Sequence, residues 1–401
     1  MQHSIAEQPR VEQVEKGLDF SLFYFDGKGG SGDEDKYRLL VEGAKFADEH
    51  GFEAVWTPER HFHAFGGMYP NPSVTSAALA MVTRNICLRA GSVVAPLHHY
   101  LRIAEEWALI DNLSHGRVGV SFASGWHVND FVLAPAQYPN RKEEMIRSIQ
   151  KVQRLWRGEP VTLENGGGKT VDVQIFPRPV QRELPVWVTC SGNPETFELA
   201  GQLGAGVLTH LLGQTVDELR TKINLYRESL AQHGHASTGQ VTLMIHTYIG
   251  ESVEAVRETI RNPFCEYLRS SLSLIKNQLQ NASGNSAIPW RKSGRGGQSE
   301  RATRQYRATD DLDSHELVAH AFDRYFDTAA LFGTPEKCLS TLELLQETGV
   351  NEVACLIDFG VNTDSVLRGL EYLDSTKNMY ESRRKTRAAS QIQDFNEDLS
   401  A

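Results

Sequence analysis

The sequence predicts a closed barrel of eight parallel β-strands alternating with α-helices, the (β/α)8 TIM barrel. Segments rich in β-branched and aromatic residues recur along the chain, and helical patterns separate nearly all of them. This alternation is typical of a parallel sheet, and eight units favour closure into a barrel. The competing architecture is an open, doubly wound sheet. That fold is expected to carry a GxGxxG turn after the first strand, and residues 27–32 read GKGGSG, which does not match.

The predicted elements follow the chain in order. Strands are expected at residues 18–25, 52–56, 86–94, 118–122, 184–189, 205–211, 241–249 and 352–358. Helices are expected at residues 34–50, 101–113, 143–156, 216–234, 254–280, 315–329, 335–348 and 364–381, with one more after the turn at 191–196. PNPS opens another helix, with Ser73 as candidate N-cap. A Gly-rich hairpin over 164–174 is expected outside the barrel.

The domain organisation follows from composition along the chain. Residues 1–17 are polar and lack the apolar core of a signal peptide, so we expect a flexible leader. Residues 18–381 form one barrel, and 382–401 form a polar C-terminal tail. Residues 281–309 are rich in Ser, Gly, Arg and Gln, which predicts a mobile surface insertion after the seventh strand.

Composition excludes several classes of protein. With 40% hydrophobic residues, a formal net charge of −10 and no apolar run as long as a membrane span, the chain is expected to bind neither nucleic acid nor a membrane. The five cysteines include no CxxC pair, which fits reduced thiols in the cytoplasm. They are Cys87, Cys190, Cys265, Cys338 and Cys355.

The fourth predicted strand is the centre of the functional prediction. RVGVSFASGW, Arg117–Trp126, reads as a buried strand that enters the small-residue turn at Ser124 and Gly125, followed by Trp126. Little side-chain bulk in this turn allows a flat ligand or a phosphate to approach the backbone. A plain strand-to-helix turn remains the alternative.

Two other segments carry polar groups to the same edge of a barrel. Glu59, Arg60 and His61 follow the second strand, where His61 suits proton transfer near neutral pH. We expect no metal there, because the loop lacks a recognised ligand spacing. SGNPET, residues 191–196, precedes a helix whose N-terminus suits a phosphate, with plain N-capping as the alternative.

Together these stretches resemble the bacterial luciferase-like flavin monooxygenases, over about residues 18–373. The resemblance rests on GFEAVWTPERHFHAFGGMYPNPSV, the turn after Gly91, EEWALIDNLSHGRVGVSFASGWHVNDF and residues 190–206. The segment AALFGTPEKC…ETGVNEVACLIDFGV is most similar to the subgroup associated with polyketide and nonribosomal-peptide assembly lines. In this order the motifs are specific.

The resemblance implies a cofactor and partners. It implies reduced FMN, FMNH2, delivered by a separate flavin reductase, and O2, with oxygenation through a flavin C4a-hydroperoxide. It also implies a non-proline cis peptide at Gly91–Ser92 and often a homodimer. The cofactor-binding residues it implies, with the turns above, are Gly91, Ser92, Ser124, Gly125, Trp126, Ser191, Gly192, Asn193 and Thr196.

Two positions depart from the luciferases. Arg60 replaces a histidine that they use, and Ser124 replaces an arginine that binds their phosphate. Both differences argue against light emission and an aldehyde substrate, and they leave the phosphate without an identified charge partner. We assign His61 to hydrogen bonding or proton transfer, and Arg60 to electrostatics beside it.

The sequence therefore predicts a two-component monooxygenase that acts on a natural-product intermediate, free or bound to a carrier protein. Two rivals stay open. One is a deazaflavin (F420)-dependent hydride-transfer enzyme on the same barrel, and the other is a non-catalytic flavin-binding partner protein.

Overall fold

The closed barrel is confirmed. The computed structural model describes residues 17–25, 35–235, 238–281 and 314–398. Eight parallel strands follow one another around the ring, and the last pairs back with the first. In ring order they are β1 (Asp19–Phe23), β2 (Ala54–Thr57), β3 (Cys87–Val94), β4 (Val118–Ala123), β7 (Val186–Thr189), β8 (Gly206–His210), β9 (Val241–Ile249) and β11 (Glu352–Leu356). Each lies within a residue or two of its predicted place.

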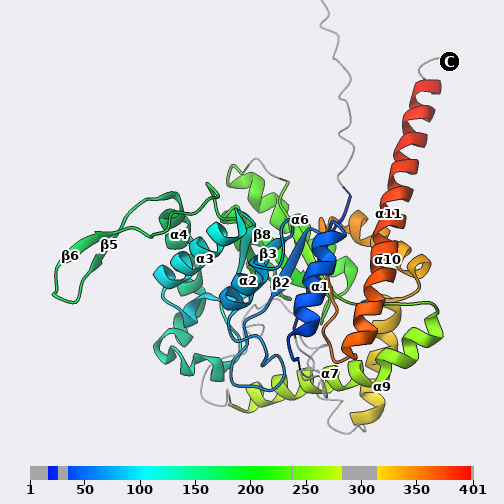
Figure 1. Ribbon diagram of the computed structural model, residues 1–401, viewed down its shortest axis with the longest axis horizontal. Helices are drawn as coiled ribbons and strands as arrows, with labels where there is room; N and C mark the ends of the chain where they lie inside the picture. The colour runs from blue at the N-terminus through cyan, green and yellow to red at the C-terminus, as the bar shows by residue number, and fades with distance from the viewer. Residues whose placement is uncertain (1–16, 26–34, 236–237, 282–313, 399–401) are drawn as a thin grey trace, which may run out of the picture.

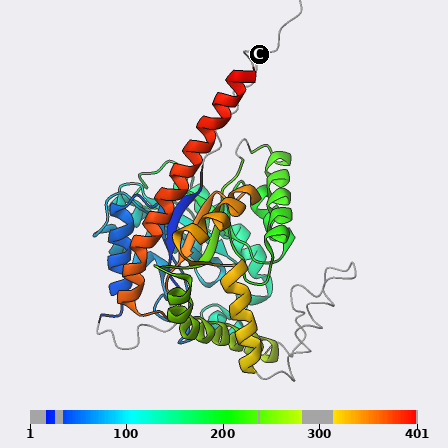
Figure 2. The same cartoon turned by 90° about the vertical axis from the view of Figure 1, so that its right-hand side faces the viewer.

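Helices surround the ring, as Figures 1 and 2 show. They are α1 (Arg38–Glu49), α2 (Pro72–Ala80), α3 (Tyr100–Ser114), α4 (Arg141–Arg157), α5 (Pro194–Gln202), α6 (Val216–Gln232), α7 (Val253–Asn281), α9 (Ser314–Thr328), α10 (Pro335–Thr348) and α11 (Thr363–Asp398). The last helix continues 17 residues beyond the predicted end at 381, to Asp398, and projects away from the barrel in both views.

Two further pairings lie outside the ring. The predicted hairpin is confirmed as β5 (Val161–Glu164) and β6 (Thr170–Val173), which extend from the body at the left of Figure 1. A strand that was not predicted, β10 (Leu331–Gly333), pairs with the end of β9. Three residues directly after a helix carry too little periodicity to predict a strand.

The start of α2 corrects one prediction. The N-cap is Asn71, whose side-chain oxygen accepts hydrogen bonds from the backbone N–H groups of Ser73 (2.8 Å) and Val74 (3.4 Å). Ser73 is therefore not the cap. The physical reason is Pro72, because proline favours the first helical position and so leaves the residue before it as the cap.

The amino-terminal end of the barrel is closed by a buried ionic cluster around Glu352. This carboxylate accepts hydrogen bonds from Arg89 Nη1 (2.7 Å), Trp56 Nε1 (2.8 Å), Ser21 Oγ (2.5 Å) and Thr242 Oγ1 (3.1 Å). Four strands other than its own supply these donors, so the cluster ties much of the ring together. It lies far below the strand ends that carry the predicted site.

The bond between Gly91 and Ser92 is cis, as the resemblance implied. A Cβ on Gly91 would lie 2.7 Å from the ring of Phe23, so no larger residue fits there. The hydroxyl of Ser92 lies 2.6 Å from Thr189 Oγ1. Gly91 and Ser92 thus contact other residues inside the barrel: Gly91 packs against Phe23, and Ser92 is hydrogen-bonded to Thr189.

Within the ranges described above, no helix is long and apolar enough to cross a membrane. The predicted leader, apart from Gly17, and the predicted insertion, apart from its first residue, lie outside the described residues.

Candidate active site

The loops after β2, β3 and β4 meet at the carboxyl end of the barrel. Glu59, two residues beyond β2, accepts a hydrogen bond from Val94 N–H at the end of β3 (2.7 Å). Arg60 lies over the ring of Trp126, beyond β4, with 5.0 Å between the guanidinium carbon and the ring centroid. The structure therefore brings together the predicted Glu59, Arg60 and Trp126.

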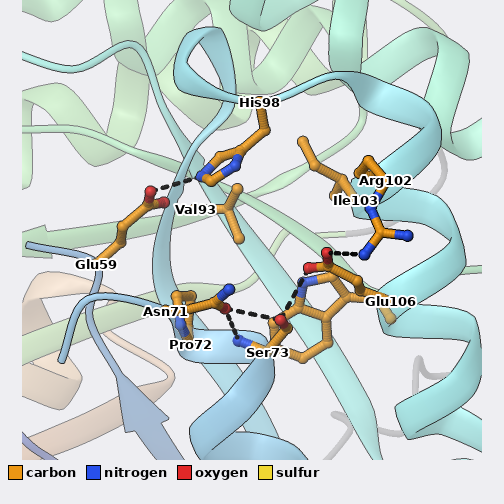
Figure 3. A pocket seen from close by; sticks show the side chains of 10 residues that line it. Glu59, Asn71, Pro72, Ser73, Val93, His98, Arg102, Ile103 and Glu106 are labelled. Carbon is orange, nitrogen blue, oxygen red and sulfur yellow. Dashed lines mark hydrogen bonds and ion pairs between the residues drawn. The ribbon is translucent and has the colours of Figure 1, made fainter. Parts of the chain in front are cut away.

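Glu59 holds two histidines. One of its oxygens, Oε1, accepts from His61 Nε2 (2.8 Å) and from His98 Nε2 (2.5 Å). Its side chain is fully buried, while His61 keeps 12% of its side chain exposed. His98 lies on the loop after β3, and Figure 3 shows its ring directed at Glu59. Both rings are held at Nε2, so the Nδ1 atom of each ring is not used in binding Glu59.

Glu59, His61 and His98 form a hydrogen-bonded triad in which the pKa values of Glu59 and His98 are shifted in opposite directions. Burial by itself would raise the pKa of Glu59, but the hydrogen bonds from His61 and His98 outweigh it and lower that pKa. Burial likewise opposes the charged form of His98, yet its hydrogen bond and attraction to Glu59 raise the pKa of His98 above its ordinary value. Glu59 is thus an ionised carboxylate that favours protonated His98.

Behind Glu59 lies a cavity of about 20 Å³, shown in Figure 3. It is closed on its far side by Ser73, whose hydroxyl donates to Glu106 (2.8 Å), and by Asn71 and Trp107. This volume has room for about one water. The cavity is therefore too small for a flavin or an organic substrate.

Arg60 is a buried cation whose guanidinium has no hydrogen-bonded partner at Nε or Nη2 among the described residues. Only 5% of the residue is exposed, and its Nε and Nη2 atoms are buried without a hydrogen bond. Burial lowers its pKa, which attraction to Asp130 partly counteracts. No ion pair of the guanidinium is found among the residues that the structure describes.

Further polar atoms at the mouth are unsatisfied. His127 Nδ1 and Asp130 Oδ1 lie 3.7 Å apart, within ion-pair range but too far for a hydrogen bond, and both are buried without another partner. His246 Nε2 is also buried and unpaired, among the rings of Phe264 and Tyr267. Buried polar atoms are normally hydrogen-bonded, so this concentration indicates a ligand-binding region.

Helix α7 covers this end of the barrel, below the strands in Figures 1 and 2. Its Tyr267 packs on Phe65, from the loop after β2, and on His246 of β9, at ring distances of 5.0 and 4.7 Å. Burial raises the pKa of Tyr267 and lowers that of His246 to about 3. Both side chains are therefore neutral, and α7 supplies an apolar, aromatic wall.

The turn after β4 has a cation beside it. Arg141, at the start of α4, donates from Nε to the carbonyl of Gly125 (3.2 Å) and stacks on Tyr138. Ser124 is half-buried next to it. Short 3-10 helices between Val128 and Asn140 fold the chain back and so bring Arg141 to the turn.

The turn before α5 lies beside that of β4, because β4 and β7 are paired. Asn193 caps the helix itself, accepting from Glu195 N–H (3.1 Å), as the capping alternative expects. Ser191 and Gly192 are exposed, and a Cβ on Gly192 would meet nothing within 4 Å. This region is therefore open to a ligand, separate from the buried triad.

Among the described residues, no group of three or more His, Cys, Asp or Glu side chains has the geometry to hold a metal ion. Glu59, His61 and His98 share hydrogen bonds instead.

With this geometry, comparison with known proteins identifies the family. The model of the luciferase-like monooxygenases matches residues 18–352. The chain belongs to this family. It is 25% identical over 349 residues to the oxygenase component of flavin-dependent trigonelline monooxygenase of Acinetobacter baylyi, covering 84% of this chain and 87% of that protein. The family and its monooxygenase relatives make the chain a flavin-dependent oxidoreductase.

Other similar proteins include monooxygenases of Streptomyces and an F420-dependent enzyme. A 4-hydroxyprotoasukamycin monooxygenase of Streptomyces nodosus is 27% identical, covering 59% of this chain and 65% of that one. The crystal structure of monooxygenase RslO1 from Streptomyces bottropensis superposes with a TM-score of 0.71 at 21% identity, covering 90% and 98% of the two chains. An F420-dependent glucose-6-phosphate dehydrogenase of Amycolatopsis mediterranei is 31% identical, over 43% of this chain and 53% of that one.

Sequence reasoning missed three residues of this region, namely His98, Arg141 and Tyr267. His98 follows the third strand, so its position alone could have placed it at the mouth. Arg141 and Tyr267 reach the mouth through turns and a helix far along the chain, and no local pattern indicates them.

Proposed function

We propose that the chain is the oxygenase component of a two-component system, which uses reduced FMN from a separate reductase and O2 to oxygenate a natural-product intermediate, free or carrier-bound. The observation that carries the proposal is the Glu59–His61–His98 triad beside unsatisfied polar groups at the mouth of a luciferase-like barrel. The relatives named as the oxygenase component of trigonelline monooxygenase and as 4-hydroxyprotoasukamycin monooxygenase support it.

The residues present fit a flavin. Unpaired polar atoms at the mouth other than those of Arg60, namely His127 Nδ1, Asp130 Oδ1 and His246 Nε2, match a ring system edged with polar atoms. Reduced flavin supplies the electrons that activate O2. The aromatic wall of α7 excludes water from the reacting atoms, which protects reactive species from hydrolysis and proton leakage.

The phosphate would lie between the turns after β4 and before α5. Arg141 supplies the positive charge that the sequence left unassigned, and Ser124 and Ser191 supply hydroxyls. The positive end of the α5 dipole, with Thr196 in its first turn, also favours an anion, although Asn193 already accepts hydrogen bonds from the Glu195 and Thr196 N–H groups. Gly125 allows the turn its positive φ of 77° and packs closely against Phe131 and Val94, while Gly91 and Ser92 act from inside the barrel.

His61 is the residue proposed to move a proton. Its Nε2 is held by the buried carboxylate of Glu59, which fixes the ring and stabilises the imidazolium when the ring gains a proton at Nδ1. His98 shares that carboxylate, and the attraction between them raises the pKa of His98. Glu59 therefore orients the histidines, as a carboxylate does in other acid–base dyads.

The test mixes protein and FMNH2, prepared without oxygen, with air-saturated buffer. We expect flavin reoxidation kinetics distinct from those of free FMNH2, and His61→Ala should change them by at least about tenfold while FMN still binds. His233→Ala, at an exposed position on the far side, is the matched control. Reoxidation identical to that of free FMNH2 contradicts the proposal.

The second candidate is hydride transfer with F420, favoured by the F420-dependent relative. The two candidates differ in their need for O2. Binding of reduced F420 in place of FMNH2, with turnover that continues without O2, would select the second candidate.

We also propose that the chain forms a homodimer in the cytoplasm. Support for dimerisation comes from large apolar side chains on the outer surface of the adjacent α2 and α3, with exposures of 65% (Val74), 70% (Met81, at the end of α2), 50% (Leu109) and 40% (Leu113). The five unpaired cysteines support a reducing compartment. Leu109→Glu should convert the dimer to monomer in light scattering, and an unchanged mass contradicts this surface.

A further inference from the structure

We propose that Arg60 binds a carboxylate of the organic substrate, so that this oxygenase acts on an acid. The inference deepens the proposed function by naming a substrate class, and it depends on that function only in taking the barrel mouth as the place where substrate binds. The starting observation is a cation that is 5% exposed and whose guanidinium donates no hydrogen bond among the described residues.

The two unpaired atoms define the shape of the missing partner. Nε and Nη2 carry the two parallel N–H groups along one edge of the guanidinium plane. A carboxylate presents two oxygens at the matching spacing, and this paired contact is the preferred geometry of arginine with a planar acid. A single carbonyl or hydroxyl oxygen would leave one of the buried donors unsatisfied.

The surroundings hold Arg60 in place without neutralising it. Its face stacks on Trp126 at 5.0 Å, and its backbone N–H donates to the carbonyl of Tyr69 (2.9 Å), so the side chain is ordered before any ligand binds. Asp130 is close enough to influence the charge of Arg60. The carboxylate of Asp130, however, lies within ion-pair range of His127 and not of Arg60. The positive charge of Arg60 thus remains available.

Arg60 also lies next to the residue that moves the proton. It adjoins His61 in the chain, and both follow β2 at the barrel mouth. A carboxylate on Arg60 would therefore hold the substrate at the same loop that carries His61. The pyrimidine edge of the flavin offers a similar pair of acceptors, so the experiment has to separate the two sources.

The experiment measures binding, without turnover, of benzoate and of benzamide to the full-length protein by calorimetry, with and without FMN. The two probes share size and shape and differ in charge. We expect benzoate to bind at least about tenfold more tightly than benzamide, and Arg60→Gln to abolish this difference. Arg60→Lys keeps the charge but loses the planar fork, so it should restore only part of the preference.

The control is Arg154→Gln, which removes an arginine that is 51% exposed on α4 and should leave the benzoate affinity unchanged. Far-ultraviolet circular dichroism establishes that each variant is folded. Equal affinity for the two probes, or an Arg60→Gln protein that keeps its preference, overturns the inference. So does an Arg60→Gln protein that loses affinity for FMN alone, because the guanidinium would then serve the flavin.

This result is separable from the proposed function. If the protein prefers benzoate through Arg60 but does not bind FMNH2, the acid site stands and the oxygenase proposal fails. If FMNH2 binds and reoxidises as proposed while benzoate shows no preference, the oxygenase proposal stands and the acid site fails.

Discussion

Two buried arginines at opposite ends of the barrel show how one residue type serves two purposes. Arg89 and Arg60 are 7% and 5% exposed, and each lies over tryptophan rings. Arg89 donates to Glu352 (2.7 Å) and Glu53 (2.6 Å), and attraction to these carboxylates raises its pKa although burial opposes it. Arg60 has no such partner, and burial lowers its pKa.

The difference shows where this fold tolerates buried polar atoms that lack a hydrogen bond. At the amino-terminal end the Glu352 cluster is paired, with Trp187 Nε1 as its one unpaired neighbour. At the carboxyl end the unpaired atoms of Arg60, His127, Asp130 and His246 gather. Proteins depart from complete hydrogen bonding mainly at functional sites, so this contrast supports the proposal that the paired end is structural and the unpaired end is the site.

The largest expected effect comes from substituting the two arginines in the same way. Arg89→Gln leaves Glu352 as an uncompensated buried charge and should lower the free energy of unfolding by about 3–5 kcal/mol. Arg60→Gln removes an unpaired charge and should lower it by less than about 1 kcal/mol. Urea unfolding at pH 7 measures both. Similar losses in the two variants would break the comparison.

The second prediction concerns acid stability at the mouth. Burial is the main reason that the pKa of His246 is lowered to about 3 in the folded state. The contribution of neutral His246 to the free energy of unfolding is therefore complete above the unfolded pKa of about 6.5, and it is lost as the pH falls toward 3. Lowering the pH from 6.5 to 5 should therefore reduce the free energy of unfolding by about 2 kcal/mol through this group. His246→Phe suits the ring cluster and should remove this loss in urea unfolding at several pH values. His233→Phe is the exposed control, and equal acid losses in the wild type and His246→Phe contradict the assignment.

A smaller effect is expected from Glu59→Gln, which keeps the shape of the triad and removes its charge. The pKa of His98 should fall, because its hydrogen bond and attraction to the carboxylate are what raise it. The free energy of unfolding should drop by about 1–3 kcal/mol near pH 6, since Glu59 contributes above about pH 4.3 and His98 below about pH 6.5.

Nuclear magnetic resonance titration of the histidine rings, together with urea unfolding, measures both changes. An unchanged His98 titration in Glu59→Gln would show that the carboxylate does not set its charge.

The smallest effect is expected for Trp126→Ala. This change removes the ring under the Arg60 guanidinium, whose contribution should be about 0.5–1 kcal/mol at a half-exposed tryptophan. Trp126→Phe should retain part of it. A loss above about 2 kcal/mol would mean that Trp126 supports the fold in the way the Glu352 cluster does.

The sequence predicted the fold well and the site in part. Strand and helix positions follow from local periodicity, and the order of alternation determines the ring, so the barrel and the outer hairpin were expected. The cis bond at Gly91–Ser92 was implied by the family resemblance. Glu59, Arg60 and His61 were predicted because they lie directly after a strand. The end of α11 was placed too early, since its last turns have few apolar residues to mark a helix.

What the sequence could not show depends on the tertiary structure. His98, Arg141 and Tyr267 reach the mouth from other loops and helices, and nothing in their local sequence indicates their partners. The distinction between Arg60 and Arg89 is likewise invisible in the sequence, because it rests on which carboxylates are within reach. Pairing across the ring thus decides which charged residues are structural.

The most direct test of the central claim, that the unpaired end of the barrel binds reduced flavin, is an oxygen-free titration of the protein with FMNH2. The account predicts saturable binding of one FMNH2 per chain, weakened at least about tenfold in Arg141→Gln and unchanged in the control Arg154→Gln. Absence of FMNH2 binding, or equal binding by all three proteins, would contradict it.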